Sequence, residues 1–218
     1  ITIHRVKRLV FEQNKWLALS IPAMFTLLIL AALDQVDLIM VEILDPDEDA
    51  VGLFAAAIQI ASWFFLLGST LGLILMPFIG QAKSLFLRRR LLRWYTHGFA
   101  WPALILLGLC IVFGKTILGW FGPAYPVAYH AFVILGLGAF FHQMFYCGML
   151  FLLLYGYEKL FLILNVSIIG LDIGLNAVLI PKFSIIGAAI ASSISFVLLA
   201  LIVAVVVRFQ FRLHVIQL

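Results

Sequence analysis

The sequence predicts an all-α polytopic membrane protein in which six transmembrane helices form one bundle. Hydrophobic residues make up 65% of the 218 residues and charged residues only 11%. Soluble domains average about 45–50% apolar and ~25% charged residues. The apolar residues occur in blocks as long as the ~20 residues that span a bilayer core. Period-two alternation is absent from these blocks, which excludes a membrane β-barrel.

The first predicted span, 16–44, follows a basic segment, 1–15, that we expect to approach the membrane from the cytoplasm. Trp16 is expected to anchor the span at the membrane interface, where tryptophan is enriched. The span stops at 45–49, which holds three aspartates, a glutamate and a proline. So many acids around a proline predict an exposed turn.

The second span, 51–80, carries Gly68 and Gly72, which give it a G-x-x-x-G face for close helix packing. The next segment, 81–95, mixes basic with apolar residues. It predicts a short amphipathic helix on the inner membrane surface. We expect anionic membrane lipids to contact its basic residues: Lys83, Arg88, Arg89, Arg90 and Arg93.

The remaining predicted segments are four spans and a cytoplasmic tail: 96–121, 127–155, 160–180, 185–207 and 208–218. The fifth and sixth spans form a hairpin, because only a short turn around Pro181 separates them. The sixth span opens with Gly187, Ala191 and Ser195, spaced by four. These residues predict a small-residue face that a neighbouring helix can approach closely.

The basic residues predict how the bundle is oriented. If the N-terminus is inside, all but two of the 14 lysines and arginines fall in cytoplasmic segments. The exceptions are Lys115 and Lys182. This asymmetry satisfies the positive-inside rule, so we expect both termini in the cytoplasm. The net charge of +4 does not indicate nucleic-acid binding, because the bases lie between apolar blocks.

Polar residues on the fifth span are the strongest candidates for function. Asp172, Asn176 and Asn165 fall within about 40° of one another around a helix, so they form one polar stripe. Acids in membrane helices are costly and face a bundle interior or a wet cavity. Asp172 therefore predicts a proton, cation or substrate site. The alternative is an acid that only fixes helix packing.

Three further residues are weaker candidates. Asp34 and Asp37 share a helix face, and we expect them near the outer mouth of the cavity. They could bind an ion or simply be wetted there. Lys115, near the outer end of the third span, either extends to the interface or contacts an anionic substrate group.

Nothing in the sequence indicates catalysis, a cofactor or a metal centre. His142 and Tyr146 share a helix face, but a histidine in a membrane bundle is more often a packed polar group than a catalyst. Cys110 and Cys147 lie inside apolar spans, so we expect small buried groups and no disulfide. We therefore expect a protein that is not an enzyme and needs neither cofactor nor metal.

Several motifs, taken in order, resemble one protein family. The run LDIGLNAVLIPKFSIIGAAIA, starting at Leu171, resembles the penultimate hairpin of bacterial polysaccharide flippases of the O-antigen type. Ser184 stands where that pattern has glycine. The turn with Phe121, Gly122 and Tyr125 and the acid at Asp37 also match family positions. The resemblance extends from about residue 15 to residue 207, nearly the whole chain.

The resemblance places the chain with the multidrug/oligosaccharidyl-lipid/polysaccharide exporters. It implies one bundle of a two-bundle fold of about twelve helices, here the C-terminal half, so the N-terminal bundle would be a partner. It also implies a bacterial inner membrane. The implied activity is transport of a polyprenyl-diphosphate-linked oligosaccharide from the inner to the outer leaflet, for surface polysaccharides such as O-antigen lipopolysaccharide. Coupling to a cation gradient is implied as well.

Other functions are open at this point. A cation-coupled small-molecule exporter of the same superfamily would show drug efflux without a lipid-linked sugar. A membrane scaffold subunit would use its acids only for packing, so no single polar substitution would impair transport. A membrane acyltransferase is a weaker alternative, because no histidine with a partner acid is evident.

Overall fold

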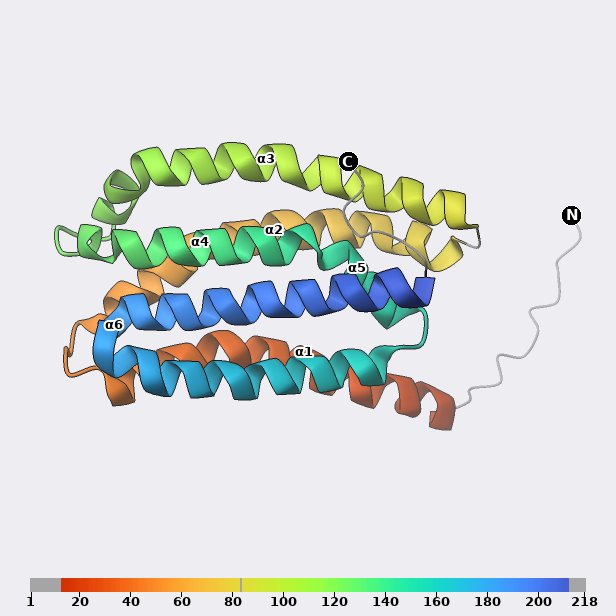
Figure 1. Ribbon diagram of the computed structural model, residues 1–218, viewed down its shortest axis with the longest axis horizontal. Coiled ribbons are helices and arrows are strands. Elements are labelled where there is room, and N and C mark those ends of the chain that lie inside the picture. The colour runs from red at the N-terminus through yellow and green to blue at the C-terminus, as the bar shows by residue number, and fades with distance from the viewer. Residues whose placement is uncertain (1–12, 83, 212–218) are drawn as a thin grey trace, which may run out of the picture.

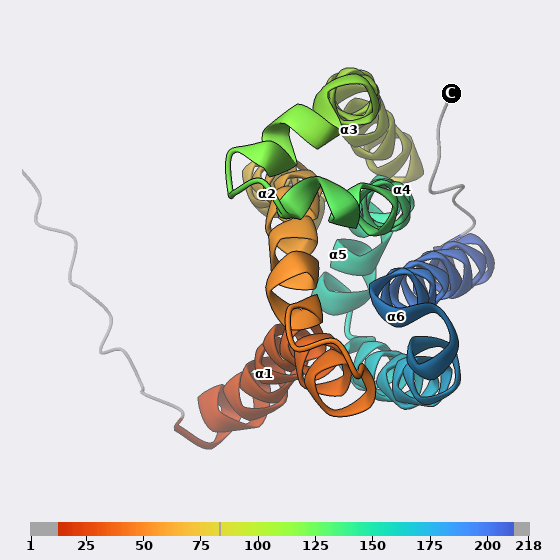
Figure 2. The ribbon, with the colours of Figure 1, turned by 90° about the vertical axis from the view of Figure 1, so that its left-hand side faces the viewer.

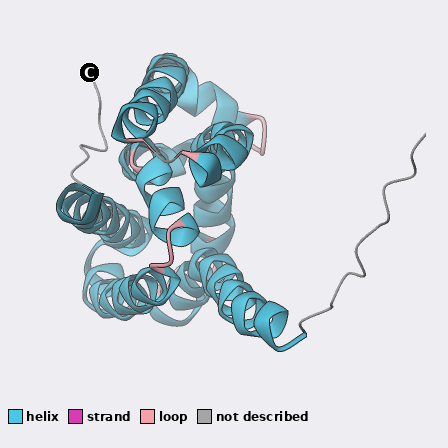
Figure 3. Ribbon diagram, turned by 90° about the vertical axis from the view of Figure 1, so that its right-hand side faces the viewer, coloured by secondary structure: helices cyan, strands magenta, loops and turns pink. Residues whose placement is uncertain are grey.

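The computed structural model describes residues 13–82 and 84–211, and only some of the side chains of the first helix before residue 35. The described part is helical, with elements running lengthwise beside one another (Figure 1). The all-α fold class is thus confirmed. Viewed from its ends, the molecule is a single bundle in which α2, α4, α5 and α6 surround the centre (Figures 2 and 3).

The first two helices are joined by the acidic turn. α1 (Gln13–Leu44) and α2 (Ala50–Gln81) end and begin beside it. Within the turn, Asp45 accepts the backbone N–H of Asp47, and Asp47 accepts that of Asp49, both at 3.1 Å. These local bonds satisfy backbone donors that no helix can use, so the aspartates favour a turn here.

The predicted packing face on α2 is confirmed. A Cβ on Gly68 would lie 2.3 Å from Oε1 of Gln143, and one on Gly72 would lie 2.5 Å from the Tyr146 ring. Glycine is therefore required at both positions for α2 to approach the fourth predicted span.

Two predicted segments differ from the observed helices. The basic segment 81–95 is not a separate surface helix, because α3 runs without a break over Leu85–Gly119. Ser84 caps it by accepting the N–H of Leu87 at 3.2 Å, and α3 contains no proline before Pro102. The fourth span is divided into α4 (Tyr129–Met144), preceded by the 3₁₀ turn η1 (Tyr125–Ala128), and α5 (Tyr146–Leu154).

The last element, α6 (Glu158–Phe211), contains the predicted hairpin. Its two arms meet at Ser184, whose φ of 53° and ψ of −140° reverse the chain. A positive φ favours glycine, which explains why the flippase pattern has glycine at this turn. Ser184 also donates a hydrogen bond to Asp45. The two connections at this end of the bundle are thereby tied together.

The helix order gives the bundle two distinct ends (Figure 1). One end, which we call the turn end, holds the acidic turn 45–49 and Ser184. At the other, the terminal end, the described part of α1 begins and α6 finishes. α6 packs mainly against α4 and α1, and α2 against α4. The first arm of α6 lies beside α1, where Asn176 contacts Asp37, and the second arm contacts α4 through Ser193 and Ile134.

Four of the described helical stretches are long and apolar enough to cross a membrane: α2, α3, η1 with α4, and α6. Large apolar side chains also cover the outer surface, among them Phe78, Trp101 and Phe113. These features support a multi-pass membrane protein. The count of six spans and the orientation of the termini remain predictions.

Candidate functional site

Two aspartates meet in the interior through one asparagine. Nδ2 of Asn176 donates to Oδ1 of Asp37 at 2.8 Å and to Oδ2 of Asp172 at 3.0 Å. An amide nitrogen carries two hydrogens, so it can serve both carboxyl groups at once. Asp172 and Asn176 are one turn apart on α6, and Asp37 comes from α1. The pair of acids is therefore built from two helices.

The second arm of α6 completes the site with two serines. Ser192 Oγ lies 2.7 Å from Oδ2 of Asp37, and Ser195 Oγ donates to Oδ1 of Asp172 at 2.8 Å. The reversal at Ser184 brings this arm back along the first one. Each carboxyl group thus has one serine and one shared amide as neighbours. We call these five residues the carboxylate cluster: Asp37, Asp172, Asn176, Ser192 and Ser195.

The carboxylate cluster is almost inaccessible to solvent. Asp37 is 6% exposed and Asp172 only 1%. The hydrogen bonds given to the two acids all come from neutral groups. Two negative charges in such a place are costly unless a positive charge compensates them. Among the described residues, no group of three or more histidine, cysteine or acidic side chains could hold a metal ion.

Ser192 has more acceptors than its single hydrogen can serve. Its Oγ lies 2.7 Å from Asp37 and 3.0 Å from the carbonyl oxygen of Ala188. If Asp37 carries a proton, the carboxyl group can donate to Ser192, and Ser192 can donate to Ala188. If Asp37 is charged, Ser192 can turn its hydrogen to the carboxylate. The geometry accommodates both forms of the acid.

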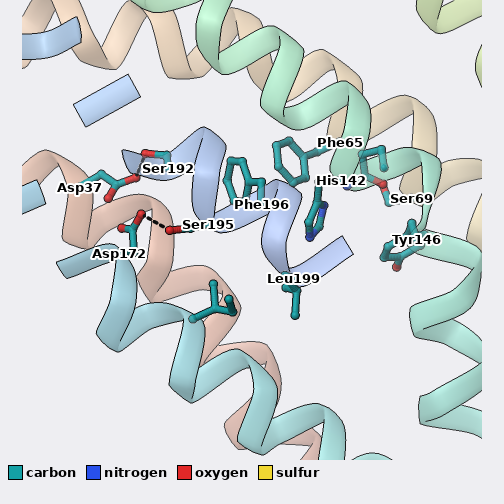
Figure 4. A pocket seen from close by; sticks show the side chains of 12 residues that line it. Asp37, Phe65, Ser69, His142, Tyr146, Asp172, Ser192, Ser195, Phe196 and Leu199 are labelled. Carbon is teal, nitrogen blue, oxygen red and sulfur yellow. Dashed lines mark hydrogen bonds between the residues drawn. The ribbon is translucent and has the colours of Figure 1, made fainter. Parts of the chain in front are cut away.

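Two cavities reach the carboxylate cluster. The inner cavity has a volume of about 200 Å³ and extends from Asp37 and Asp172 towards His142 and Tyr146 (Figure 4). The outer cavity, about 150 Å³, extends from Asp37 towards the turn end. It is lined by Asp37, Ile58, Ala61, Ser62, Phe65, Leu135, Ala139, Ser192 and Phe196.

The structure brings together three of the six predicted site residues, Asp172, Asn176 and Asp37. Asn165 is buried on the same helix, but its amide donates to the carbonyl oxygen of Phe161 at 2.7 Å. Lys115 is exposed on α3, with its Nζ 5.5 Å from the centroid of the Tyr129 ring. The side chain of Asp34 lies outside the described residues.

Asp37, which we expected near the outer mouth of the cavity, has its carboxyl group buried beside Asn176. Asp37 lies about two helical turns before Leu44 at the turn end, and Asn176 lies about two turns before Ser184 at the same end. The two residues are therefore at a similar distance from the turn end. The shared amide and Ser192 satisfy the buried carboxyl oxygens.

Ser192 was not among the predicted site residues, and Ser195 was assigned only to packing. Their neighbours, Gly187 and Ala191, do belong to a close-packed face, because a Cβ on Gly187 would lie 2.3 Å from the carbonyl oxygen of Leu179. Serine is only slightly larger than alanine, so a small-residue face accepts it in the same way. What distinguishes the two serines from packing residues is their place in the hairpin, because they lie opposite the part of the first arm that carries Asp172.

The cysteine prediction is also supported, since Cys110 and Cys147 are both buried and free.

Comparison with known proteins identifies the fold. One similar structure is a MOP superfamily transporter from Pyrococcus furiosus, whose binding pocket is reported to have reverse polarity. It has a TM-score of 0.60 and 24% identity, and the match covers 89% of this chain and 44% of that one. A second is a multidrug resistance MATE family transporter of the MOP superfamily in an outward-facing conformation. It has a TM-score of 0.58 and 26% identity, and the match covers 91% of this chain and 45% of that transporter.

No family model and no curated protein matches the sequence. The structural likeness nevertheless supports the exporter superfamily expected from the sequence motifs. This chain spans less than half the length of the two transporters that it matches, and over that length it has their helical-bundle fold.

Proposed function

We propose that this chain is one helical bundle of a proton-coupled membrane exporter, and that Asp37 and Asp172 bind the coupling proton. The observation that carries the proposal is the buried pair of acids joined by Asn176, for which the described residues provide only neutral hydrogen-bond partners. An uncompensated pair of carboxylates at this depth favours uptake of a positive charge. Such a site changes its charge during a transport cycle, which is what coupling requires.

We take the proton as the first candidate, because the hydrogen bonding of Ser192 accommodates a protonated Asp37 as well as a charged one. The hydroxyl group lies between Asp37 and the Ala188 carbonyl oxygen, an arrangement that suits a protonated acid. A monovalent cation is the second candidate, because the buried Oδ1 of Asn176 has no hydrogen-bond partner and could join the carboxylates as a ligand. In both cases the bundle would rock against a second bundle, with the site near the middle of the membrane.

Two substrate classes follow from different observations. The hairpin motif around Pro181 favours a polyprenyl-diphosphate-linked oligosaccharide, flipped between leaflets of a bacterial inner membrane. The acidic interior favours a cationic or neutral small molecule, because the cavities of the carboxylate cluster are lined by acids and no lysine or arginine among the described residues. In the flippase, the other bundle would supply the positive charge for the diphosphate.

Infrared spectroscopy of the full-length protein in lipid tests the proposal without a known substrate. A buried protonated carboxyl group has a C=O absorption that a carboxylate lacks. We expect this band to appear reversibly as the pH falls and to be lost or shifted in Asp37→Asn and Asp172→Asn. Addition of Na⁺ at constant pH is expected to leave it unchanged. A band that Na⁺ displaces would favour the cation, and a band that neither variant alters would overturn the proposal.

The transport role has its own test. In cells that depend on the protein, Asp172→Asn is expected to abolish export while the folded protein persists in the membrane. Ethidium efflux and the transfer of lipid-linked sugar to the outer leaflet distinguish the two substrate classes. Normal export of both by the variant would leave the packing role of a scaffold subunit as the explanation.

A further inference from the structure

The inner cavity contains a buried histidine that the proposed function has not used. His142 is 7% exposed, and its Nδ1 has no hydrogen-bond partner. The next residue, Gln143, is 2% exposed, and its Oε1 is likewise without a partner. Buried polar atoms are normally satisfied, so two adjacent exceptions beside a cavity require an explanation.

Two phenylalanine rings lie beside His142 and form part of the wall of the inner cavity (Figure 4). The ring centroid of His142 is 5.4 Å from that of Phe65 and 5.2 Å from that of Phe196. The two phenylalanine rings are themselves 5.3 Å apart, and both line the inner and the outer cavity. They therefore belong to the wall that the two cavities share. The carboxylate cluster therefore has one approach from the turn end and another that passes His142.

Among the described residues that line the inner cavity, His142 is the one basic side chain. The titratable groups that share this cavity are Asp37 from α1, Asp172 from the first arm of α6, and Tyr146 from α5. The lining residues from α2 and the second arm of α6 are Phe65, Ser69, Ser192, Ser195, Phe196 and Leu199, none of which titrates. The imidazole of His142 therefore lies between the two acids, Asp37 and Asp172, and the terminal end of the bundle.

We propose that His142 carries protons between the carboxylate cluster and the terminal end of the bundle. The inference rests on the proposed function, since it requires that the acids bind a proton. The O–H bond of a protonated Asp172 breaks, water in the inner cavity passes the proton on, and an N–H bond forms on the imidazole. The products are a carboxylate and an imidazolium. The rings of Phe65 and Phe196 lie within the distance of a cation–π contact with the imidazolium, which then releases its proton towards the terminal end.

The cavity has room for this route. A water molecule occupies about 30 Å³ of liquid and needs two to four polar partners. The inner cavity, with about 200 Å³, holds several, and Ser69, Gln143, Tyr146 and Ser195 offer hydrogen bonds along its wall. The unpartnered Oε1 of Gln143 is then an acceptor for such a water molecule.

The test is the rate at which the acids gain or lose their proton after a pH jump, followed through the carboxyl band in the infrared. We expect His142→Gln to keep the amplitude of the band and to slow its appearance roughly tenfold or more, within the range of general acid–base effects. His130→Gln on the same helix is the matched control, because His130 is exposed. An unchanged rate in His142→Gln would overturn the inference. If the unsubstituted protein showed no such carboxyl band at any pH, the proposed function itself would be refuted.

Chemical rescue separates proton transfer from packing. His142→Ala leaves a space of imidazole size. Added imidazole is expected to restore the rate, and pyrrole, which has the same size and no basic nitrogen, is expected not to restore it. Equal rescue by both compounds would show that His142 only fills space, and would overturn the proposed proton transfer.

A second inference concerns the start of α3 and stands on separate observations. Three exposed arginines line a surface hollow of about 410 Å³ with Phe86 and Trp94: Arg89, Arg90 and Arg93. Arg90 and Trp94 also border an apolar groove of about 410 Å³ between α2 and α3. Leu71, Ile74, Leu75 and Phe78 form the α2 side of that groove.

Arg88 is not part of this surface. Its Nε donates to the carbonyl oxygen of Ala82 at 2.9 Å, and its guanidinium lies 4.3 Å from the centroid of the Tyr155 ring. It therefore ties α3 to the end of α2 and to α5. Lys83, which was expected to contact lipid, lies outside the described residues. The five predicted lipid contacts thus divide into one structural arginine, one undescribed lysine and three surface arginines.

We infer that the hollow and the groove together bind one anionic phospholipid. Its phosphate would contact the three arginines, which suit phosphate as hydrogen-bond donors, and an acyl chain would lie in the groove. The charge of the hollow and the apolar character of the adjoining groove match the two parts of such a lipid. The guanidinium carbon of Arg90 lies 5.2 Å from the centroid of the Trp94 ring, and Arg90 lines both the hollow and the groove.

Native mass spectrometry of the full-length protein with phosphatidylglycerol or phosphatidylcholine tests the inference. We expect phosphatidylglycerol to bind more tightly, and Arg89→Gln/Arg90→Gln/Arg93→Gln to weaken it about tenfold or more. Lys182→Gln, an exposed base at the turn end, is the control. Ile74→Trp should weaken binding by filling the groove. Equal binding of both lipids, or binding of glycerophosphoglycerol as tight as that of the lipid, would overturn the inference.

Discussion

Asn176 donates a hydrogen bond to Asp37 across 2.8 Å, although the two residues are 139 positions apart in the sequence. The same amide nitrogen serves Asp172 one turn earlier on its own helix. A neutral side chain thus keeps two acids at a fixed separation while leaving their charge uncompensated. The tie between α1 and α6 is therefore also the element that defines the carboxylate cluster.

Asn176→Ala is expected to destabilise the protein more than any other single polar-to-alanine change in the carboxylate cluster. It removes donors from two carboxyl groups at once, and each hydrogen bond to a charged group contributes roughly 1.5–3 kcal/mol. Asn165→Ala is the control, because the amide of Asn165 serves only the Phe161 carbonyl oxygen of its own helix. Thermal unfolding in detergent measures both. Equal losses in the two variants would contradict a special role for Asn176.

The turn end offers a test of backbone strain. Ser184 has a φ of 53° and a ψ of −140°, a sparsely populated conformation that costs a non-glycine residue roughly 1–3 kcal/mol. Ser184→Gly relieves this strain but removes the hydrogen bond to Asp45. In the background of Asp45→Ala, where that bond is already absent, we expect Ser184→Gly to stabilise by about 1 kcal/mol. Denaturant unfolding of the four proteins in this cycle gives the coupling between the two residues. No gain in the alanine background would mean that the turn is unstrained.

Close packing of α2 against α4 and α5 predicts a contrast between glycines. Gly68→Ala and Gly72→Ala would place Cβ atoms against Gln143 and Tyr146, so we expect each to lower stability by roughly 1–3 kcal/mol. Gly108→Ala on α3 is the control, since a Cβ there meets nothing within 4 Å. Alanine is the better helix former by about 1 kcal/mol, so the control is expected to be neutral or stabilising. Equal effects at all three positions would contradict the packing account.

How much of this site the sequence predicts depends on the range of the contacts. Asp172 and Asn176 were predicted together because helix periodicity is local, and Pro181 marked the hairpin that follows them. The contact of Asp37 with Asn176 depends on how two distant helices pack, which periodicity does not give. The break at Phe145 was not predicted, because Phe145 is neither proline nor glycine and apolar residues continue on both sides.

The two serines of the second arm provide the last prediction, because a third serine between them differs in its partner. Ser192 and Ser195 face Asp37 and Asp172, whereas Ser193 donates to the carbonyl oxygen of Ile134 at 2.9 Å. Ser192→Ala and Ser195→Ala each remove one hydrogen bond to a carboxyl group. A hydrogen bond that contributes about 1.4 kcal/mol changes the affinity of the acid for a proton about tenfold. We expect both to shift the pH at which the carboxyl band appears, and Ser193→Ala to leave that pH unchanged while lowering stability. If all three variants moved the band equally, a general loosening of the α4–α6 contact would explain the shift, and the serines would not belong to the proton site.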